Sequence, residues 1–176
     1  KRKKLLVLDF DGVICNSIDE CLVTSWNAFH GENLLQKEKI PIKFKDYFSK
    51  NRYFVRPAKE FYVLYKMYSN KFENDINNFN KIKNSCKKDI EKFEFEFFNK
   101  RNWLKNNSKW YDLHNIYNHV NLFLSSFKEN FFIVTTKDKD SVIKLSDYFG
   151  FKEKILGIYS KEDGNNKLSL FNKLTK

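Results

Sequence analysis

The chain has 176 residues, of which 41% are hydrophobic and 18% aromatic, and this composition is sufficient for a buried globular core. Its apolar runs, such as residues 5–8 and 131–134, are far shorter than the ~18 residues of a membrane-spanning helix, so we expect a soluble, cytoplasmic protein with no membrane partner. The three cysteines show neither a C-x-x-C pair nor metal-ligand spacing, which argues against a disulfide framework and a zinc site.

The net charge of +11 is the electrostatic pattern expected of a nucleic-acid-binding protein. The make-up of this charge argues against that function, because only four of the 33 basic residues are arginine and nucleic-acid recognition favours the bidentate guanidinium group. Lys, Asn, Phe and Ile are abundant while Gly and Pro are scarce, as AT-rich codons would produce. We interpret the charge as a compositional bias spread over solvated surfaces.

The first expected element is a strand. Residues 4–8 form a largely apolar run that ends in Asp9-Phe10-Asp11-Gly12, the pattern of a strand buried on both faces whose carboxyl end opens into a polar loop. A capping box at residues 17–20 then begins a helix, whose apolar residues recur at helical spacing until Gly31 ends it.

From residue 32 to about residue 130 the sequence shows repeated helical patterns and no convincing alternating strand. Three segments are expected to be helices, at residues 61–68, 76–98 and 111–127. The first of these follows Pro57, a residue typical of helix starts. The middle of the chain is therefore predicted to be all helical.

Strand character returns near the end of the chain. An apolar strand is expected at residues 131–134, a helix at residues 141–149 and a second apolar strand at residues 155–159. Strands that alternate with helices at this spacing predict an α/β fold with a doubly wound parallel sheet, into which the helical middle is inserted. We assign residues 1–16 and 128–176 to the α/β core and residues 17–127 to the all-helical insertion.

Polar residues follow two of the expected strands where they end. Asp9 and Asp11 come directly after the first strand, and Thr135 and Thr136 follow the second. Because ligands of an open α/β sheet bind beyond the carboxyl ends of its strands, we expect these side chains to converge. Two carboxylates suit Mg²⁺, which prefers oxygen ligands, and paired acids with a metal suit phosphoryl transfer.

By itself, a D-x-D pair after a strand is more typical of a simple turn. The string LLVLDFDGVI at residues 5–14, followed by Asn-Ser, however, closely resembles the first motif of the haloacid dehalogenase superfamily. The resemblance implies that Asp9 is the nucleophile, that Asp11 is the general acid/base, and that both contribute to Mg²⁺ binding, Asp11 through its backbone carbonyl. Dehalogenase members lack the second aspartate, so its presence indicates phosphate esters as substrates.

Two further motifs extend the resemblance. The segment FFIVTTK at residues 131–137 resembles the second motif of the family, which implies that Thr135 holds the transferring phosphoryl group. The third motif is a lysine ahead of a helix, for which Lys161 and Lys167 are both candidates. We favour Lys167, because its spacing after Thr135 fits better and the apolar residues behind it predict a helix. A solvated surface lysine is the ordinary alternative.

The family's fourth motif, an acidic loop that completes the Mg²⁺ site, has no counterpart before Lys176, so we expect the sequence to be truncated before it. The helical insertion lies where the family carries a helical cap of the C1 type, which closes over the site and selects the substrate. Arg52, Arg56 and Lys59 are candidates to contact an anionic substrate, although a solvated basic face is the simpler interpretation.

The sequence therefore predicts a Mg²⁺-dependent phosphatase that hydrolyses a phosphate monoester through an aspartyl-phosphate at Asp9. The expected partner is a small phosphorylated metabolite. A phosphomutase or a phosphonatase of the same superfamily is an alternative, because these enzymes share the first three motifs. A non-catalytic basic protein that binds nucleic acid is the alternative from a different class.

Overall fold

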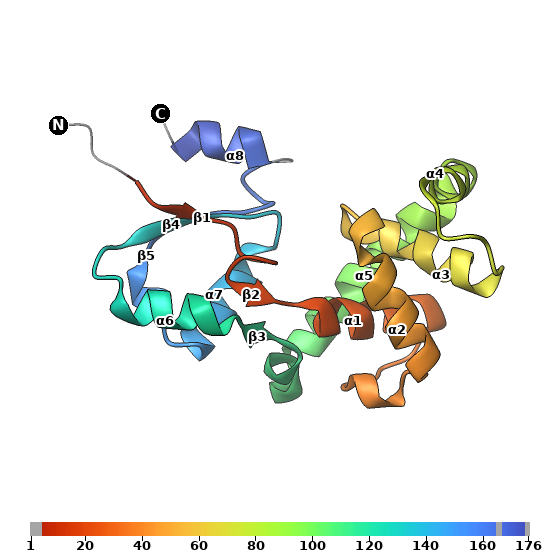
Figure 1. Ribbon diagram of the computed structural model, residues 1–176, viewed down its shortest axis with the longest axis horizontal. Coiled ribbons are helices and arrows are strands. Elements are labelled where there is room, and N and C mark those ends of the chain that lie inside the picture. The colour runs from red at the N-terminus through yellow and green to blue at the C-terminus, as the bar shows by residue number, and fades with distance from the viewer. Residues whose placement is uncertain (1–4, 165–166, 175–176) are drawn as a thin grey trace. The chain divides into compact units, whose positions relative to one another are not determined.

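The computed structural model describes residues 5–164 and 167–174. The chain divides into two compact units (Figure 1), namely Lys1–Ser17 together with His114–Lys176, and Ile18–Leu113. We call the first the sheet unit and the second the helical unit. The helical insertion, expected to extend to residue 127, ends at residue 113 in this division. No helix in the described part of the chain is long and apolar enough to cross a membrane.

A three-stranded parallel sheet forms the centre of the sheet unit, in the order β1 (Val7–Leu8), β4 (Phe131–Val134) and β5 (Ile155–Tyr159). Leu8 pairs with Ile133, which in turn pairs with Ile158. Phe131 and Ile133 of the central strand are fully buried, because helices cover such a sheet on its faces. The three strand predictions are confirmed, with the first strand shorter than the run at residues 4–8.

Helices follow the two later strands of this sheet (Figure 1). α7 (Lys139–Tyr148) packs against β5, and α8 (Lys167–Leu174) packs against β4 and β5. α7 begins after Asp138, whose carboxylate accepts a hydrogen bond from the backbone N–H of Ser141 at 3.0 Å. Gly150, with φ of 77°, lies just beyond its end. These elements form the α/β arrangement that the sequence predicts.

The prediction of a single helix over residues 111–127 is wrong. That segment holds the end of a 3₁₀ helix, η4 (Ser108–Leu113), a short strand, β3 (Asn115–Ile116), and the helix α6 (Asn118–Ser126). β3 pairs antiparallel with β2 (Cys15–Asn16), and this pairing requires extended backbone in the middle of the helical pattern. The same pairing attaches the segment to the sheet unit, which explains why the helical unit ends earlier than expected.

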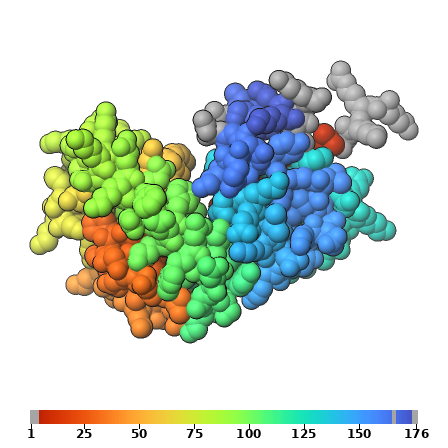
Figure 2. All heavy atoms as spheres, turned by 180° about the vertical axis from the view of Figure 1, so that it is seen from behind, coloured from red at the N-terminus to blue at the C-terminus, as the bar shows by residue number. Residues whose placement is uncertain are grey.

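The helical unit contains no strand among its residues, all of which the structure describes. Its α-helices are α1 (Ile18–His30), α2 (Ile42–Asn51), α3 (Phe61–Ser69), α4 (Ile76–Ser85) and α5 (Lys87–Lys105), and its further 3₁₀ turns are η1 (Lys37–Lys39), η2 (Arg52–Phe54) and η3 (Ala58–Glu60). Figure 2 shows the side chains of α4 and α5, coloured light green to green, covering much of one face of this unit.

The single helix predicted over residues 76–98 is two helices, because the chain turns at Cys86, where φ is −112° and ψ is 30°. The two halves have different packing partners. α4 packs mainly against α3, whereas α5 packs mainly against α1. One straight helix cannot serve both surfaces, and the turn at Cys86 allows Phe79 of α4 and Phe97 of α5 each to be buried.

A buried ion pair joins α1 to α5 inside the helical unit. Glu20 is fully buried, and its two carboxylate oxygens accept hydrogen bonds from Nε and Nη2 of Arg101 at 2.8 and 2.7 Å. The hydroxyl of Thr24 donates a third hydrogen bond at 2.8 Å. The guanidinium group also lies over the ring of Phe97, 4.6 Å from its centroid. The acid of the predicted capping box thus serves to hold two helices together.

Candidate functional site

Asp9 is the first residue after β1, at the carboxyl end of the sheet. Its Oδ1 accepts a hydrogen bond from the backbone N–H of Phe10 at 2.9 Å, which fixes the side chain relative to the loop. Its Oδ2 forms an ion pair with the ammonium group of Lys167, the first residue of α8. The side chains of Asp9 and Lys167 are 24% and 53% exposed, so this pair is open to solvent and to a ligand.

Asp11 lies two residues further along the same loop and faces a different lysine. Its Oδ1 accepts a hydrogen bond from the hydroxyl of Ser17 at 2.6 Å. The ammonium of Lys137 lies 3.3 Å from Oδ1 and 3.5 Å from Oδ2. The side chain of Asp11 is 42% exposed, whereas that of Lys137 is 1% exposed. The carboxylate is therefore held by hydrogen bonds from the protein on one side and is open to solvent on the other side.

The loop around Asp11 is tight because Gly12 adopts a positive φ of 80°, a conformation that costs glycine little. The backbone N–H groups of Ile14 and Cys15 both donate to the carbonyl of Phe10, at 2.9 and 3.0 Å, and so close the turn. The conformation turns the chain back immediately after the two aspartates, and both carboxylates remain at the sheet edge.

Thr135 directly follows β4, the strand beside β1, and is buried. Its backbone N–H donates to the carbonyl of Tyr159 at 2.9 Å, and its hydroxyl accepts from the backbone N–H of Lys137 at 3.1 Å. The carbonyl of Lys137 in turn accepts a hydrogen bond from the backbone N–H of Lys161 at 3.4 Å. These bonds fix the segment after β4 against the end of β5.

The structure therefore places Asp9, Asp11 and Thr135 after adjacent parallel strands, at the edge where the sequence analysis expects them. Lys167, the favoured candidate for the third motif, forms an ion pair with Asp9 of the site. Lys137 was not among the site residues predicted from the sequence, although it stands two residues after Thr135 in the second motif. The signal was its position directly beyond a buried strand, where a lysine side chain can turn into the site.

Burial raises the pKa of the Cys15 thiol to about 11, with the contact to Ser17 opposing this effect and the negative charge of Asp11 adding to it. Cys15 is fully buried beneath the loop. Because the thiolate is the reactive form, this cysteine is a packing residue of the site and not a nucleophile.

The oxygen donors of the site fit Mg²⁺ with few protein ligands. Within the described residues, no group of three or more His, Cys, Asp or Glu side chains is placed to hold a metal ion. Asp9 and Asp11 supply two carboxylates from one loop, and Mg²⁺ is commonly held by one or two carboxylates, substrate phosphate and waters. Each carboxylate contacts an ammonium group, so a cation bound there shares or displaces these contacts.

Among solved structures, the chain is similar to one described as the crystal structure of a predicted phosphoglycolate phosphatase from Haemophilus somnus 129PT. The TM-score is 0.60 at 16% sequence identity, and the likeness covers 98% of this chain and 72% of the other. At this identity the likeness shows the fold. It is the haloacid dehalogenase-like fold, a parallel α/β core with an all-helical insertion. No protein-family model and no curated protein matches the chain.

The basic residues of the helical unit that were candidates for substrate binding have different surroundings. Lys59 forms an ion pair with Glu94 at 3.6 Å, and Arg52 donates to the carbonyl of Val55 at 2.8 Å. Arg56 borders a pocket of about 460 Å³. Their proposed contact with a substrate stays a prediction.

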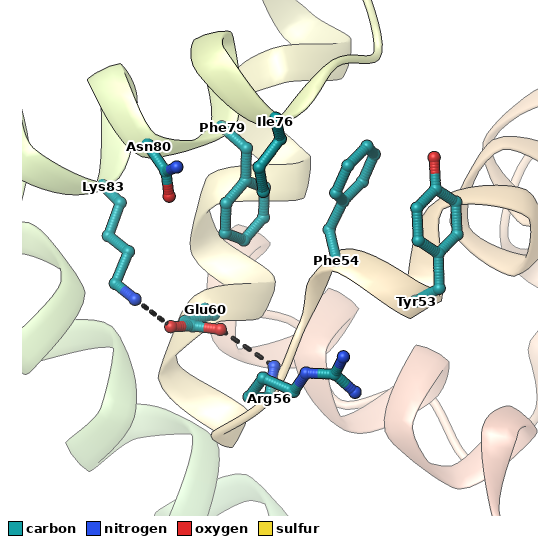
Figure 3. Close-up of a pocket in the computed structure, with 8 residues that line it drawn as sticks. All are labelled: Tyr53, Phe54, Arg56, Glu60, Ile76, Phe79, Asn80 and Lys83. Atoms are coloured by element: carbon teal, nitrogen blue, oxygen red, sulfur yellow. Dashed lines mark hydrogen bonds and ion pairs between the residues drawn. The ribbon is translucent and has the colours of Figure 1, made fainter.

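This pocket lies within the helical unit (Figure 3) and is lined by apolar, polar and charged side chains: Tyr53, Phe54, Arg56, Glu60, Ile76, Phe79, Asn80 and Lys83. Glu60 is buried, and its carboxylate accepts from the backbone N–H of Arg56 at 2.8 Å and pairs with the ammonium of Lys83. The carboxylate thereby fixes the start of α3 and one wall of the pocket.

Proposed function

We propose that this protein is a Mg²⁺-dependent phosphatase that hydrolyses a phosphate monoester through an aspartyl-phosphate at Asp9. One observation carries the proposal. Two carboxylates, Asp9 and Asp11, lie in one loop at the carboxyl edge of a parallel sheet, and each is matched by a lysine from a different segment. A structural salt bridge needs one acid, whereas phosphoryl transfer needs a nucleophile, a proton carrier and positive charge at one place.

In the proposed first step, a carboxylate oxygen of Asp9 attacks phosphorus and the bond to the leaving oxygen breaks, while Asp11 passes a proton to that oxygen. Lys167 lies on Asp9 and would offset the charge of the phosphoryl oxygens, which spreads over three atoms in the transition state. Thr135 would donate its hydroxyl and hold the phosphoryl group in line with Asp9.

In the second step, water attacks the aspartyl-phosphate, Asp11 accepts a proton from this water, and Asp9 is released as a carboxylate. Asp9, through its carboxylate, and Asp11, through its backbone carbonyl, would hold Mg²⁺, which supplies charge neutralisation between the carboxylates and the phosphate when it is bound. The cation explains how two acids and a phosphate dianion could share one loop.

The substrate we propose is the phosphate ester of a small metabolite. The solved structure with the similar fold is described as a predicted phosphoglycolate phosphatase, and phosphoglycolate is the phosphate ester of a small metabolite. We also propose that the helical unit acts as a cap, which excludes water and selects the leaving group. This role agrees with its size and all-helical build.

Replacing Asp9 with Asn tests the proposal, because an amide cannot form the acyl-phosphate. We expect turnover of p-nitrophenyl phosphate in Mg²⁺ to fall by at least about 10⁴-fold, with the thermal unfolding unchanged by so nearly isosteric a substitution. Excess chelator should stop the wild-type reaction.

The matched control is Asp140→Asn, which removes an exposed carboxylate paired with Lys144 at 3.1 Å in the same unit. It should leave turnover unchanged. Wild-type turnover in the Asp9 variant, or undiminished activity in chelator, would exclude the proposed mechanism.

A further inference from the structure

Lys137 is a lysine in an unusual environment. Its side chain is 1% exposed, although lysines are almost never fully buried without a partner. Removing an ammonium group from water costs free energy that the protein recovers only through close acceptors. The burial of Lys137 therefore requires an explanation in what its ammonium contacts.

Asp11 is an acceptor of this ammonium, and its two oxygens are not held equally. Oδ1 receives the hydroxyl of Ser17 at 2.6 Å and the ammonium of Lys137 at 3.3 Å. Oδ2 lies 3.5 Å from the same ammonium, at the limit of a hydrogen bond. One oxygen is thus anchored by two donors, and the other is left to accept a proton.

The two lysines of the site differ in how far their side chains are exposed. The side chain of Lys167 is 53% exposed and forms an ion pair with Asp9, where it is accessible to a bound phosphoryl group. Lys137 lies behind Asp11, its backbone N–H is bonded to Thr135, and its ammonium is shielded from solvent. Lys167 is placed to touch the substrate, whereas Lys137 contacts Asp11 from the protein side.

We propose that Lys137, with Ser17, is a positioning residue that holds Asp11 as the general base for the second step of the reaction. This inference rests on the proposed function. In that step the water oxygen forms a bond to phosphorus, and the bond from phosphorus to the Asp9 oxygen breaks and returns its electron pair to the carboxylate. One proton of the water passes to Oδ2 of Asp11, and inorganic phosphate leaves.

The test is Lys137→Met, which keeps the length of the side chain and removes its charge. The substrate is p-nitrophenyl phosphate, because its phenolate leaves without needing a proton and the first step then does not depend on Asp11. We expect kcat to fall about 10- to 100-fold while kcat/KM stays within about threefold, because only the hydrolysis of the phosphoenzyme is slowed.

A second readout follows from the same reasoning. The variant should release a burst of p-nitrophenolate of about one equivalent per active site before the slow steady state, as an accumulating covalent intermediate requires. Ser17→Ala removes the other donor to Oδ1 and should give the same pattern with a smaller fall in kcat. It also keeps the inference testable if Lys137→Met does not fold.

Two variants provide the contrast. Lys167→Met should lower kcat/KM, because it removes a contact with the phosphoryl group, and should show no burst. Lys144→Met removes an exposed ion pair on α7 and should change neither constant.

A parallel fall of kcat/KM in Lys137→Met and Ser17→Ala, without a burst, overturns the positioning role while the proposed function stands. Wild-type protein that turns over no phosphate ester in Mg²⁺ overturns the proposed function itself.

Discussion

The helical unit and the sheet unit both hold acidic side chains against basic ones, but in opposite ways. In the helical unit, Glu20 is fully buried and both of its oxygens are taken by Arg101. In the sheet unit, Asp9 and Asp11 remain 24% and 42% exposed, and each is approached by a lysine. The first arrangement is closed to ligands, and the second is open.

The difference shows which pair is closed and which pairs are open to a ligand. The guanidinium fork of Arg101 matches a carboxylate in two hydrogen bonds, so the pair is complete without any further group. An ammonium group is a point charge with rotatable donors, and its partners Asp9 and Asp11 keep lone pairs free for a cation or a proton. Four substitutions test this contrast, and they follow in order of the size of the expected effect on stability or activity, from the largest to the smallest.

Arg101→Met should have the largest effect on stability. It leaves the carboxylate of Glu20 buried without its partner, which typically costs about 3–5 kcal/mol. Chemical denaturation followed by the helical circular dichroism signal measures this loss. A loss below about 1 kcal/mol would show that the buried pair is not what holds α1 to α5.

Lys167→Met should have the opposite effect, a large loss of activity with little loss of stability. We expect kcat/KM to fall about 100-fold, because charge beside the phosphoryl group is removed, while the free energy of unfolding changes by less than about 1 kcal/mol for so exposed a pair. Steady-state kinetics and denaturation of the same preparation compare the two. Equal losses of stability in this variant and in Arg101→Met would remove the distinction between the pairs.

Gly12→Ala should cost about 1–2 kcal/mol, because the loop holds this residue at a φ of 80° that L-residues avoid. An added Cβ meets no atom within 4 Å, so the cost is conformational and not steric. Gly31, at a φ of 70° after α1, is the matched control with equally free space. Both variants should lose similar stability in denaturation, but only the Gly12 variant should lose turnover.

Lys144→Met should have the smallest effect. Its ion pair with Asp140 is exposed and spans one turn of α7, and such pairs contribute at most about 0.5 kcal/mol. Denaturation should show a change within that limit, with unchanged turnover. A loss as large as that of Gly12→Ala would mean that surface pairs stabilise the sheet unit more than their exposure suggests.

Local patterns were sufficient to predict several elements of this fold. The run FFIV predicted β4 and the ILGIY segment predicted β5, because buried strands of a parallel sheet are continuously apolar. They were not sufficient for the segments at residues 76–98 and 111–127. The first breaks at Cys86, which is neither Pro nor Gly, and the second is interrupted by the pairing of Asn115–Ile116 with a strand a hundred residues earlier.

The candidate site divides in the same way. Asp9, Asp11 and Thr135 were predicted because each directly follows a strand, and parallel strands bring their carboxyl ends to one edge. Lys167 was favoured over Lys161 by the apolar pattern of the helix that it begins, and its ammonium contacts Asp9. The roles of these side chains in a reaction stay predictions.

The sequence by itself determined the strands of the sheet, the order of α/β elements and the loop that carries the two aspartates, because these depend on hydrophobic periodicity and on residues adjacent along the chain. Only the tertiary structure decided where the helical unit ends, where its long helix breaks and that Lys137 lies buried against Asp11. The physical reason is that a pairing or a burial between residues far apart in the sequence, such as the 126 positions that separate Lys137 from Asp11, leaves no periodic trace in either segment.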